Sequence, residues 1–140
     1  ASNKGLETID VDQSIDHLLM AHHLFKDTPF GDMRDVDWLS QERQKLEQKH
    51  IQVLEKLAQL YLKKSDFLNT IKYSEMILKY DVTWEDAYRL LMLAYYRLQN
   101  RPQSIKWYNR CVEVLQKELN INPMQATVDL YEMILNYDLP

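Results

Sequence analysis

Residues suited to a buried face recur at three- and four-residue steps along the chain, the spacing that places side chains on one side of an α-helix. In the first part they predict a helix over about 11–26 and consist of Ile15, Leu18, Leu19, His22 and Phe25. From Trp38 they predict a long helix through Lys63 and consist of Leu39, Leu46, His50, Val53, Leu54, Leu57 and Tyr61. The stretch DTPFGD contains a proline and a glycine, so 27–37 is predicted as a connecting loop.

Residues that cap helices precede the remaining apolar stripes. The candidates are Ser65 or Asp66, Thr83 with Asp86 as a capping box, Asn100 before Pro102, and Asn122 before Pro123 at the first helical position. The sequence therefore predicts six helices joined by short turns, which is an all-α fold.

Composition agrees with a helical fold, because the chain has only two glycines and four prolines. Its 140 residues are enough for one compact domain. With 17 basic and 21 acidic residues interspersed, the net charge is −4, so this chain is not expected to bind nucleic acid by itself. It has a single cysteine, no signal-peptide pattern and no apolar run long enough to span a membrane, and we expect a cytoplasmic protein.

The sequence repeats itself with a period of 34 residues. Identical pairs at this spacing are Leu57 and Leu91, Tyr61 and Tyr95, Ile71 and Ile105, and Lys72 and Lys106. This period is typical of tetratricopeptide-type stacking, in which each unit is a helical hairpin and each hairpin covers the apolar face of its neighbour. The two units predicted here are 51–84 and 85–118.

In such a stack the first helix of each hairpin lines a concave face, which is the usual binding surface of repeat proteins. The groove positions of the two units are Gln52, Glu55, Gln59, Leu62, Lys63, Asp86, Arg89, Leu93, Tyr96 and Arg97. Arginine and exposed aromatic residues are enriched at protein contacts. The candidate partner-binding residues are therefore Glu55, Gln59, Lys63, Arg89, Leu93, Tyr96 and Arg97. The alternative is that the first or the last helix of the chain fills this groove.

Two adjacent tyrosines receive different predictions. Tyr95 repeats Tyr61 at a core-facing position, whereas Tyr96 takes the next position on the groove side. We therefore expect Tyr95→Ala to lower stability and Tyr96→Ala to spare the fold while weakening partner binding.

The histidines do not have the spacing of a helical metal site. His17 and His22 are five residues apart, whereas two ligands on one helix face need a spacing of three or four. We interpret His22 as packing on the apolar face, His17 and His23 as solvated, and His50 as partly buried, and expect no metal.

Other reactive side chains have structural explanations. Cys111 occupies a position for a small residue between helices and is interpreted as buried. Glu85 and Asp86 fall in the first turn of a helix, where negative charge complements the helix dipole. Trp84 is interpreted as packing at a helix start or against the neighbouring hairpin, and the alternative is an exposed contact patch. Since phosphate-binding loops and hydrolase motifs are also missing, we expect neither an enzyme nor a cofactor.

The chain from about 35 to 136 resembles the bacterial transcriptional activator domain. The residues that carry the resemblance are Trp38, Glu42, Arg43, the run from Glu85 to Met92, Arg101, Tyr108, Arg110, Glu118, Leu119, Pro123, Thr127, Leu130 and Tyr131. The resemblance implies a helical domain that follows a winged-helix DNA-binding domain and serves activation, self-association or signal input.

We therefore predict a tail or expression scar over 1–10, a helix and loop over 11–37, and a tetratricopeptide-like activator domain over 38–140. The functional hypothesis is a non-enzymatic interaction or effector domain of a bacterial transcription regulator, mediating activation or self-association. Its partners would be a second copy, another domain of the parent protein or transcription machinery, with DNA bound only through a separate domain and no membrane contact. The alternative is a free-standing peptide-binding adaptor of the tetratricopeptide type.

Overall fold

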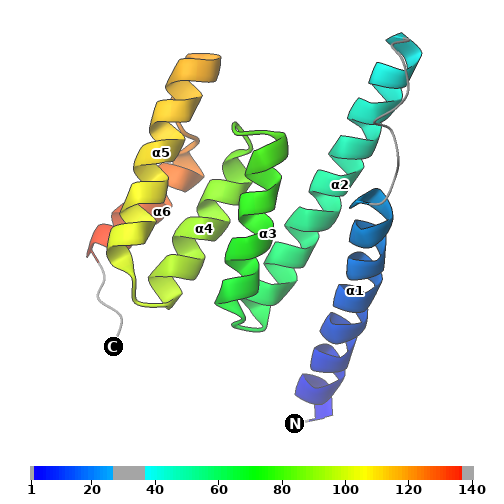
Figure 1. The fold of residues 1–140 in the computed structure, drawn as a ribbon. Coiled ribbons are helices and arrows are strands. Elements are labelled where there is room, and N and C mark those ends of the chain that lie inside the picture. Colours follow the sequence, from blue (N-terminus) through cyan, green and yellow to red (C-terminus); the bar gives the residue numbers. More distant parts are fainter. Residues whose placement is uncertain (1, 27–36, 137–140) are drawn as a thin grey trace.

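The computed structural model describes residues 2–26 and 37–136, and this part of the chain is built from helices without strands. The helices are α1 (Ser2–Lys26), α2 (Asp37–Lys63), α3 (Phe67–Tyr80), α4 (Glu85–Arg97), α5 (Arg101–Leu119) and α6 (Gln125–Asn136), as Figure 1 shows. The predicted all-α fold is confirmed. Most of the predicted loop over 27–37 lies outside the described residues, as do the side chains of Trp38 and Leu39.

Helix α1 begins at Ser2 and not near residue 11, so the expected start of the first helix is wrong. It includes most of the segment that we interpreted as a tail. The reason is local: 2–10 has no proline and only one glycine, and a single glycine costs a helix only about 1 kcal/mol.

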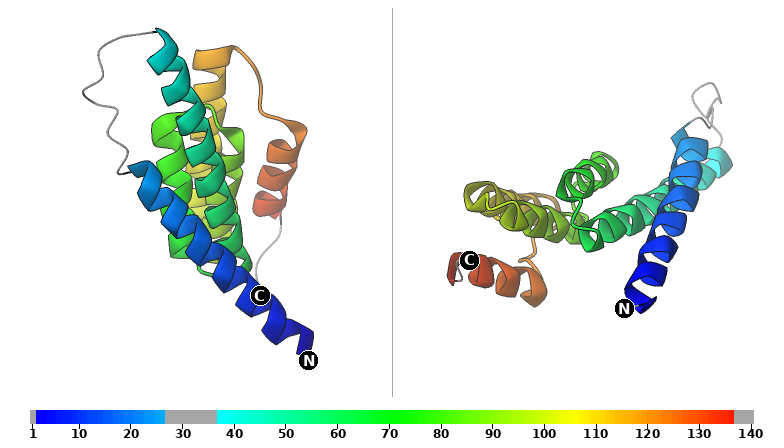
Figure 2. Two further views of the ribbon diagram at one scale, coloured as in Figure 1. Left: turned by 90° about the vertical axis from the view of Figure 1, so that its right-hand side faces the viewer. Right: turned by 90° about the horizontal axis from the view of Figure 1, so that it is seen from below.

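The helices form a row of antiparallel hairpins. Helix α2 contacts α3, and α4 contacts α5, while α3 and α2 both contact α4 across the two units. Helix α1 packs on α2 at one end, and α6 packs on α4 and α5 at the other. In the right-hand view of Figure 2, α6 and the N-terminal half of α1 lie on the side of α2 and α4 opposite α3. The outer helices therefore flank the face that α2 and α4 present.

The turns inside the two hairpins have the same backbone and capping geometry. Asp66 and Asn100 are the N-caps of α3 and α5, and the side chain of each accepts a backbone N–H three residues on at 3.3 Å. The residues just before them, Ser65 and Gln99, have φ values of 63° and 62°. The predicted caps at Asp66 and Asn100 are confirmed, and the repeat extends from sequence to backbone geometry.

A second repeated bond joins the helices of each hairpin. The buried hydroxyl of Thr70 donates to the carbonyl oxygen of Ala58 at 3.3 Å, and that of Ser104 donates to the carbonyl oxygen of Met92 at 2.6 Å. Both donors and both acceptors are 34 residues apart. A small hydroxyl residue at this position lets the helices approach closely while its polar atom stays satisfied.

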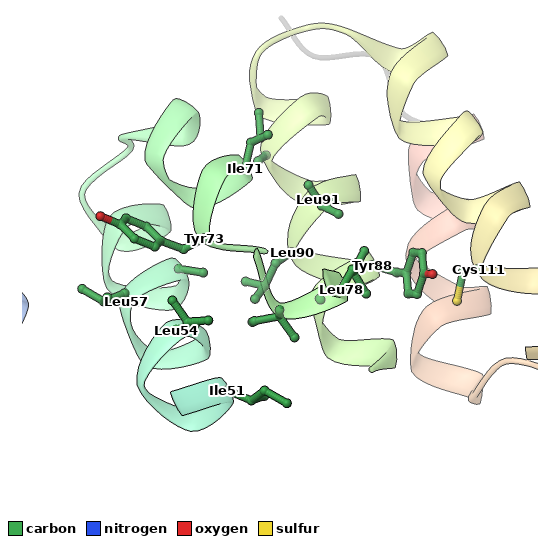
Figure 3. Packing of buried hydrophobic residues seen from close by; sticks show 14 of the residues in the cluster. Ile51, Leu54, Leu57, Ile71, Tyr73, Leu78, Tyr88, Leu90, Leu91 and Cys111 are labelled. Atoms are coloured by element: carbon green, nitrogen blue, oxygen red, sulfur yellow. The ribbon is translucent and has the colours of Figure 1, made fainter. Parts of the chain in front are cut away.

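The core lies between the hairpins, as Figure 3 shows. Leu54, Leu57 and Leu91 are fully buried, and Tyr88 is 1% exposed, so these predicted core positions are confirmed, whereas Tyr61 and Tyr95 are only half-buried. Burying side chains of this size stabilises the fold by about 1.5–3 kcal/mol each. Each hairpin supplies part of this surface, and stacking buries it.

Two predicted helix starts are wrong. The residue at the N-cap of α4 is Trp84 and not Thr83, and no side chain caps this helix, while the hydroxyl of Thr83 donates to Asp81 at 2.6 Å. Helix α6 begins at Gln125, two residues after Pro123. The preceding backbone N–H, that of Met124, donates to the carboxylate of Glu85 on α4.

The left-handed turn residues give a stability prediction. A residue other than glycine pays a steric cost at positive φ, so Gln99→Gly is expected to raise the free energy of unfolding by about 0.5–1 kcal/mol. Urea denaturation measures this change. The control is Lys106→Gly in the interior of α5, which should lower the same free energy by about 1 kcal/mol. A destabilised Gln99→Gly variant would contradict the turn geometry.

Candidate partner-binding face

The predicted groove positions lie along two helices that are side by side. Helices α2 and α4 contact each other and run in the same direction, with their C-terminal ends together at the bottom of Figure 1. Steps of three and four residues align the positions on one side of each helix. We call this surface the α2/α4 face and define it by Gln52, Glu55, Gln59, Lys63, Asp86, Arg89, Leu93 and Arg97.

Exposure differs among these residues. Gln59, Lys63 and Arg97 are exposed, whereas Glu55, Arg89 and Leu93 are half-buried. The face therefore offers solvent-accessible polar and charged groups around the partly covered Leu93, a composition that suits a protein contact.

Tyr96 is covered within the chain, so the expectation that its side chain is exposed to a partner is wrong. Its side chain is 7% exposed and packs with Met92 and Ile134 in a small core of its own. Ile134 belongs to α6, so the last helix covers Tyr96. Tyr95 is only half-buried, beside the main core. The alternative that the final helix fills part of the groove is thus what the structure shows at this position.

Arg89 is occupied by contacts within the chain. Its guanidinium donates to the hydroxyl oxygen of Thr127 at 2.7 Å and forms ion pairs with Asp86 and, at 3.5 Å, with Glu85. Thr127 is fully buried and comes from α6. Arg89 therefore holds the last helix, and its predicted role in binding a partner is not supported by its surroundings.

Glu85 is the second anchor of α6. Its carboxylate accepts the backbone N–H of Met124 at 2.7 Å and the hydroxyl of Thr127. Its side chain is only 10% exposed. A carboxylate at the N-terminal end of a helix also interacts favourably with the helix dipole. The first-turn position of Glu85 and Asp86 is as predicted, but the carboxylate of Glu85 also binds the start of α6, while that of Asp86 pairs with Arg89 of its own helix.

Glu55 of α2 bonds to the residue that precedes α4, at the same end of the face. It accepts the indole N–H of Trp84 at 3.0 Å, and Trp84 is half-buried against the core. The prediction that Trp84 packs near a helix start is confirmed. Its bond to Glu55 means that this candidate residue, like Arg89, has a structural partner.

The opposite end of the face is basic. Lys63 and Arg97 stand in the last turns of α2 and α4, where cations complement the helix dipole. The guanidinium of Arg97 lies 5.1 Å from the centre of the Phe67 ring, which places it beside the turn between α2 and α3. The neighbouring Lys64 pairs with Asp12 of α1. This end, formed by Lys63, Lys64 and Arg97, is called the basic end.

A pair of buried histidines joins α1 to α2. Nδ1 of His22 lies 2.5 Å from Nε2 of His50, and the rings are stacked with centroids 4.8 Å apart. Nδ1 of His50 lies 2.7 Å from the hydroxyl oxygen of Tyr80. Burial lowers the pKa of His50 to about 4 and also lowers the pKa of His22. The pair is therefore neutral at neutral pH, with one ring donating to the other.

The histidines and the cysteine have the burial that the sequence predicted, with one exception. His22 is buried and His17 and His23 are exposed, as predicted, while His50 is more buried than expected at 3% exposure. Cys111 is fully buried as predicted, and burial raises its thiol pKa to about 12. A thiol that stays protonated is a poor nucleophile.

The described residues contain neither a metal-binding cluster nor a membrane-spanning helix. No group of three or more histidine, cysteine, aspartate or glutamate side chains in that part of the chain could hold a metal ion. Within the same residues, no helix is long and apolar enough to cross a membrane.

Sequence reasoning missed Thr127 and the pairing of His22 with His50. Thr127 was named only for the family resemblance, and a threonine three residues after an exposed methionine carries no sign that α4 will bind it. The histidines did carry a signal, because each lies on the apolar stripe of its helix. Two polar rings on apolar stripes need a partner, and an antiparallel pair of helices can provide each with the other.

The fold and the α2/α4 face define a helical-repeat domain of the tetratricopeptide type. The family model of the bacterial transcriptional activator domain matches residues 1–135 of the chain. The chain belongs to that family, and the resemblance noted from its sequence is confirmed. The match includes the first helix, whose N-terminal part we had set apart from the domain. No curated protein and no solved structure matches the chain.

Proposed function

We propose that this chain is a non-enzymatic interaction domain of a bacterial transcription regulator, acting in the cytoplasm, and that it binds a partner protein through the α2/α4 face. The family connects the chain with transcription activation. The partner would be another domain of the parent regulator, transcription machinery or a second copy, and DNA would be bound by a separate domain.

The observation that carries this proposal is the contrast between groove positions that the fold uses and those that it leaves exposed. Tyr96, Arg89 and Glu55 are engaged by α6 or by Trp84. Gln59 and the basic end remain exposed on the α2/α4 face. A concave surface lined by the first helices of successive hairpins is how repeat proteins bind extended partners.

Selection from a random peptide library tests this function. The chain is immobilised, bound peptides are enriched, and their affinities are measured for two variants with a bulky new side chain. Gln59→Trp on α2 should weaken binding about tenfold or more, because the indole fills the middle of the face. Asn109→Trp, an exposed position on α5, is the matched control and should bind as the parent does. Peptides that bind both variants equally well would contradict the proposed face.

Self-association is a second candidate, favoured by exposed apolar side chains near the end of the stack. Leu119, Ile121, Met124 and Leu135 are each 43–58% exposed, at or after the end of α5 and on α6. Helical repeats cover such surfaces with a neighbouring unit. Sedimentation should then depend on protein concentration, and Met124→Ser with Leu135→Ser should remove that dependence. A constant sedimentation coefficient across concentrations would exclude this candidate.

A further inference from the structure

Acidic and basic residues lie at opposite ends of the α2/α4 face. On α2 the acidic Glu55 comes before the basic Lys63, and on α4 the acidic Asp86 comes before the basic Arg97. Because both helices run in the same direction, the two acids share one end of the face and the two cations share the other. The face therefore has an acidic end and a basic end.

The acidic end is satisfied inside the molecule. Glu55 accepts the indole N–H of Trp84, and Asp86 is paired with Arg89. Glu85, next to them, accepts two bonds from the start of α6. These carboxylates have partners already and offer little to a basic ligand.

The basic end carries two exposed positive charges, those of Lys63 and Arg97. Among the described residues, no carboxylate forms an ion pair with Lys63 or Arg97, and both side chains are exposed. Complementing the helix dipole, worth about 0.3–1 kcal/mol, explains why a cation stands at the end of each helix. It does not prevent that cation from binding a carboxylate, and Arg97 is held in place over the ring of Phe67.

The molecule contains an example of the ligand chemistry that fits this end. Asp12, carried on α1, forms an ion pair with Lys64, the residue next to Lys63. This hydrogen bond from the ammonium group raises the pKa of Lys64. A carboxylate presented by a helix thus reaches the basic end, while Lys63 and Arg97 remain for carboxylates from outside.

We propose that the partner of the α2/α4 face presents an acidic protein segment, whose carboxylates bind Lys63 and Arg97 while an apolar side chain packs on Leu93. This rests on the proposed function and adds the chemistry of the partner and its orientation. Nucleic acid, the other polyanion, fits less well, because the chain as a whole carries a net charge of −4.

The test compares peptide selection on two charge-reversed variants. Lys63→Glu with Arg97→Glu reverses the basic end. Lys79→Glu with Lys117→Glu is the matched control, since these exposed lysines also stand in the last turns of helices, on α3 and α5. Circular dichroism confirms that both variants fold, and their urea midpoints should fall by similar amounts, because both variants reverse two charges that complement a helix dipole.

The unaltered chain should enrich peptides rich in aspartate and glutamate. The affinity of these peptides should fall about tenfold or more when the basic end is reversed, and should change less than about twofold in the control. Their affinity for the unaltered chain should also weaken as the salt concentration rises. The reversed variant should itself enrich basic peptides.

Three results would overturn this inference, and they separate it from the proposed function. Peptides that lose binding with Gln59→Trp but carry no acidic excess would refute the acidic segment and leave the interaction face intact. Selection that yields no peptide sensitive to Gln59→Trp would refute both. A DNA oligonucleotide that binds the unaltered chain and displaces selected peptides would assign the basic end to nucleic acid.

Discussion

Tyr96→Ala is expected to lower the free energy of unfolding by about 3–5 kcal/mol, the cost of deleting a large buried aromatic ring. The ring is 7% exposed and lies between Met92 and Ile134, so its loss leaves a cavity beneath α6. Urea denaturation measures the change, and amide hydrogen exchange should show the amides of α6 exchanging faster.

The adjacent tyrosine is the control. Tyr95 is half-buried, so Tyr95→Ala should cost less, about 1–2 kcal/mol. This order is the reverse of the one that the sequence alone predicts. If Tyr95→Ala proved more damaging than Tyr96→Ala, α6 would not cover the groove side of α4 in solution.

Acid is expected to loosen the docking of α1 on α2. The pKa of His50 is lowered from 6.5 to about 4 in the folded chain, mainly by burial and then by His22, so the unfolded state binds protons more readily between these values. Stability from this group is therefore complete above pH 6.5 and decreases as pH falls towards 4. At 1.36 kcal/mol per pH unit, the loss across this whole range is on the order of 3 kcal/mol.

Other charged groups around the pair act on the same titration. His23 and Lys26 of α1 and Lys72 of α3 each lower the pKa of His22, so they add to the effect of burial. On the α2 and α3 side, Glu47 acts on Tyr80, whose pKa is raised mainly by burial. These neighbours disfavour a protonated His22 while α1 is docked on α2. Protonation in acid therefore favours release of α1 before the rest of the core unfolds.

Urea denaturation at a series of pH values between 7 and 4.5 tests this dependence. His50→Phe retains a ring beside Phe25 but cannot titrate, so its stability should depend less on pH than that of the unaltered chain. His17→Gln, at an exposed position, should keep the full dependence. Equal pH dependence in all three proteins would show that the histidine pair does not titrate with folding.

The two hairpins were predictable from sequence because they repeat with a fixed period. The last helix was also predicted, near Pro123, but the residues that it covers were not. Helix α3 has 14 residues, whereas α5 has 19, so α6 does not follow the 34-residue period that predicts the contacts between the two hairpins. Tyr96 and Arg89 both contact α6.

The candidate face was predicted in part. Gln59, Lys63 and Arg97 are exposed as expected, because their exposure depends only on their helix and the next unit. Glu55, Arg89 and Tyr96 are not free for a partner, because each is met by a side chain 29 or more residues away in sequence. Contacts of that kind depend on how whole helices dock, which a local pattern does not encode.

The central claim is that a partner protein binds between α1 and α6 on the α2/α4 face. The most direct measurement is the change in backbone amide chemical shifts when a selected peptide is added to the isotope-labelled chain. Our account predicts that the largest changes fall at the exposed positions of the face, which are Gln52, Gln59, Lys63 and Arg97, and at Leu93. Largest changes on the outer surfaces of α3 and α5 would contradict it.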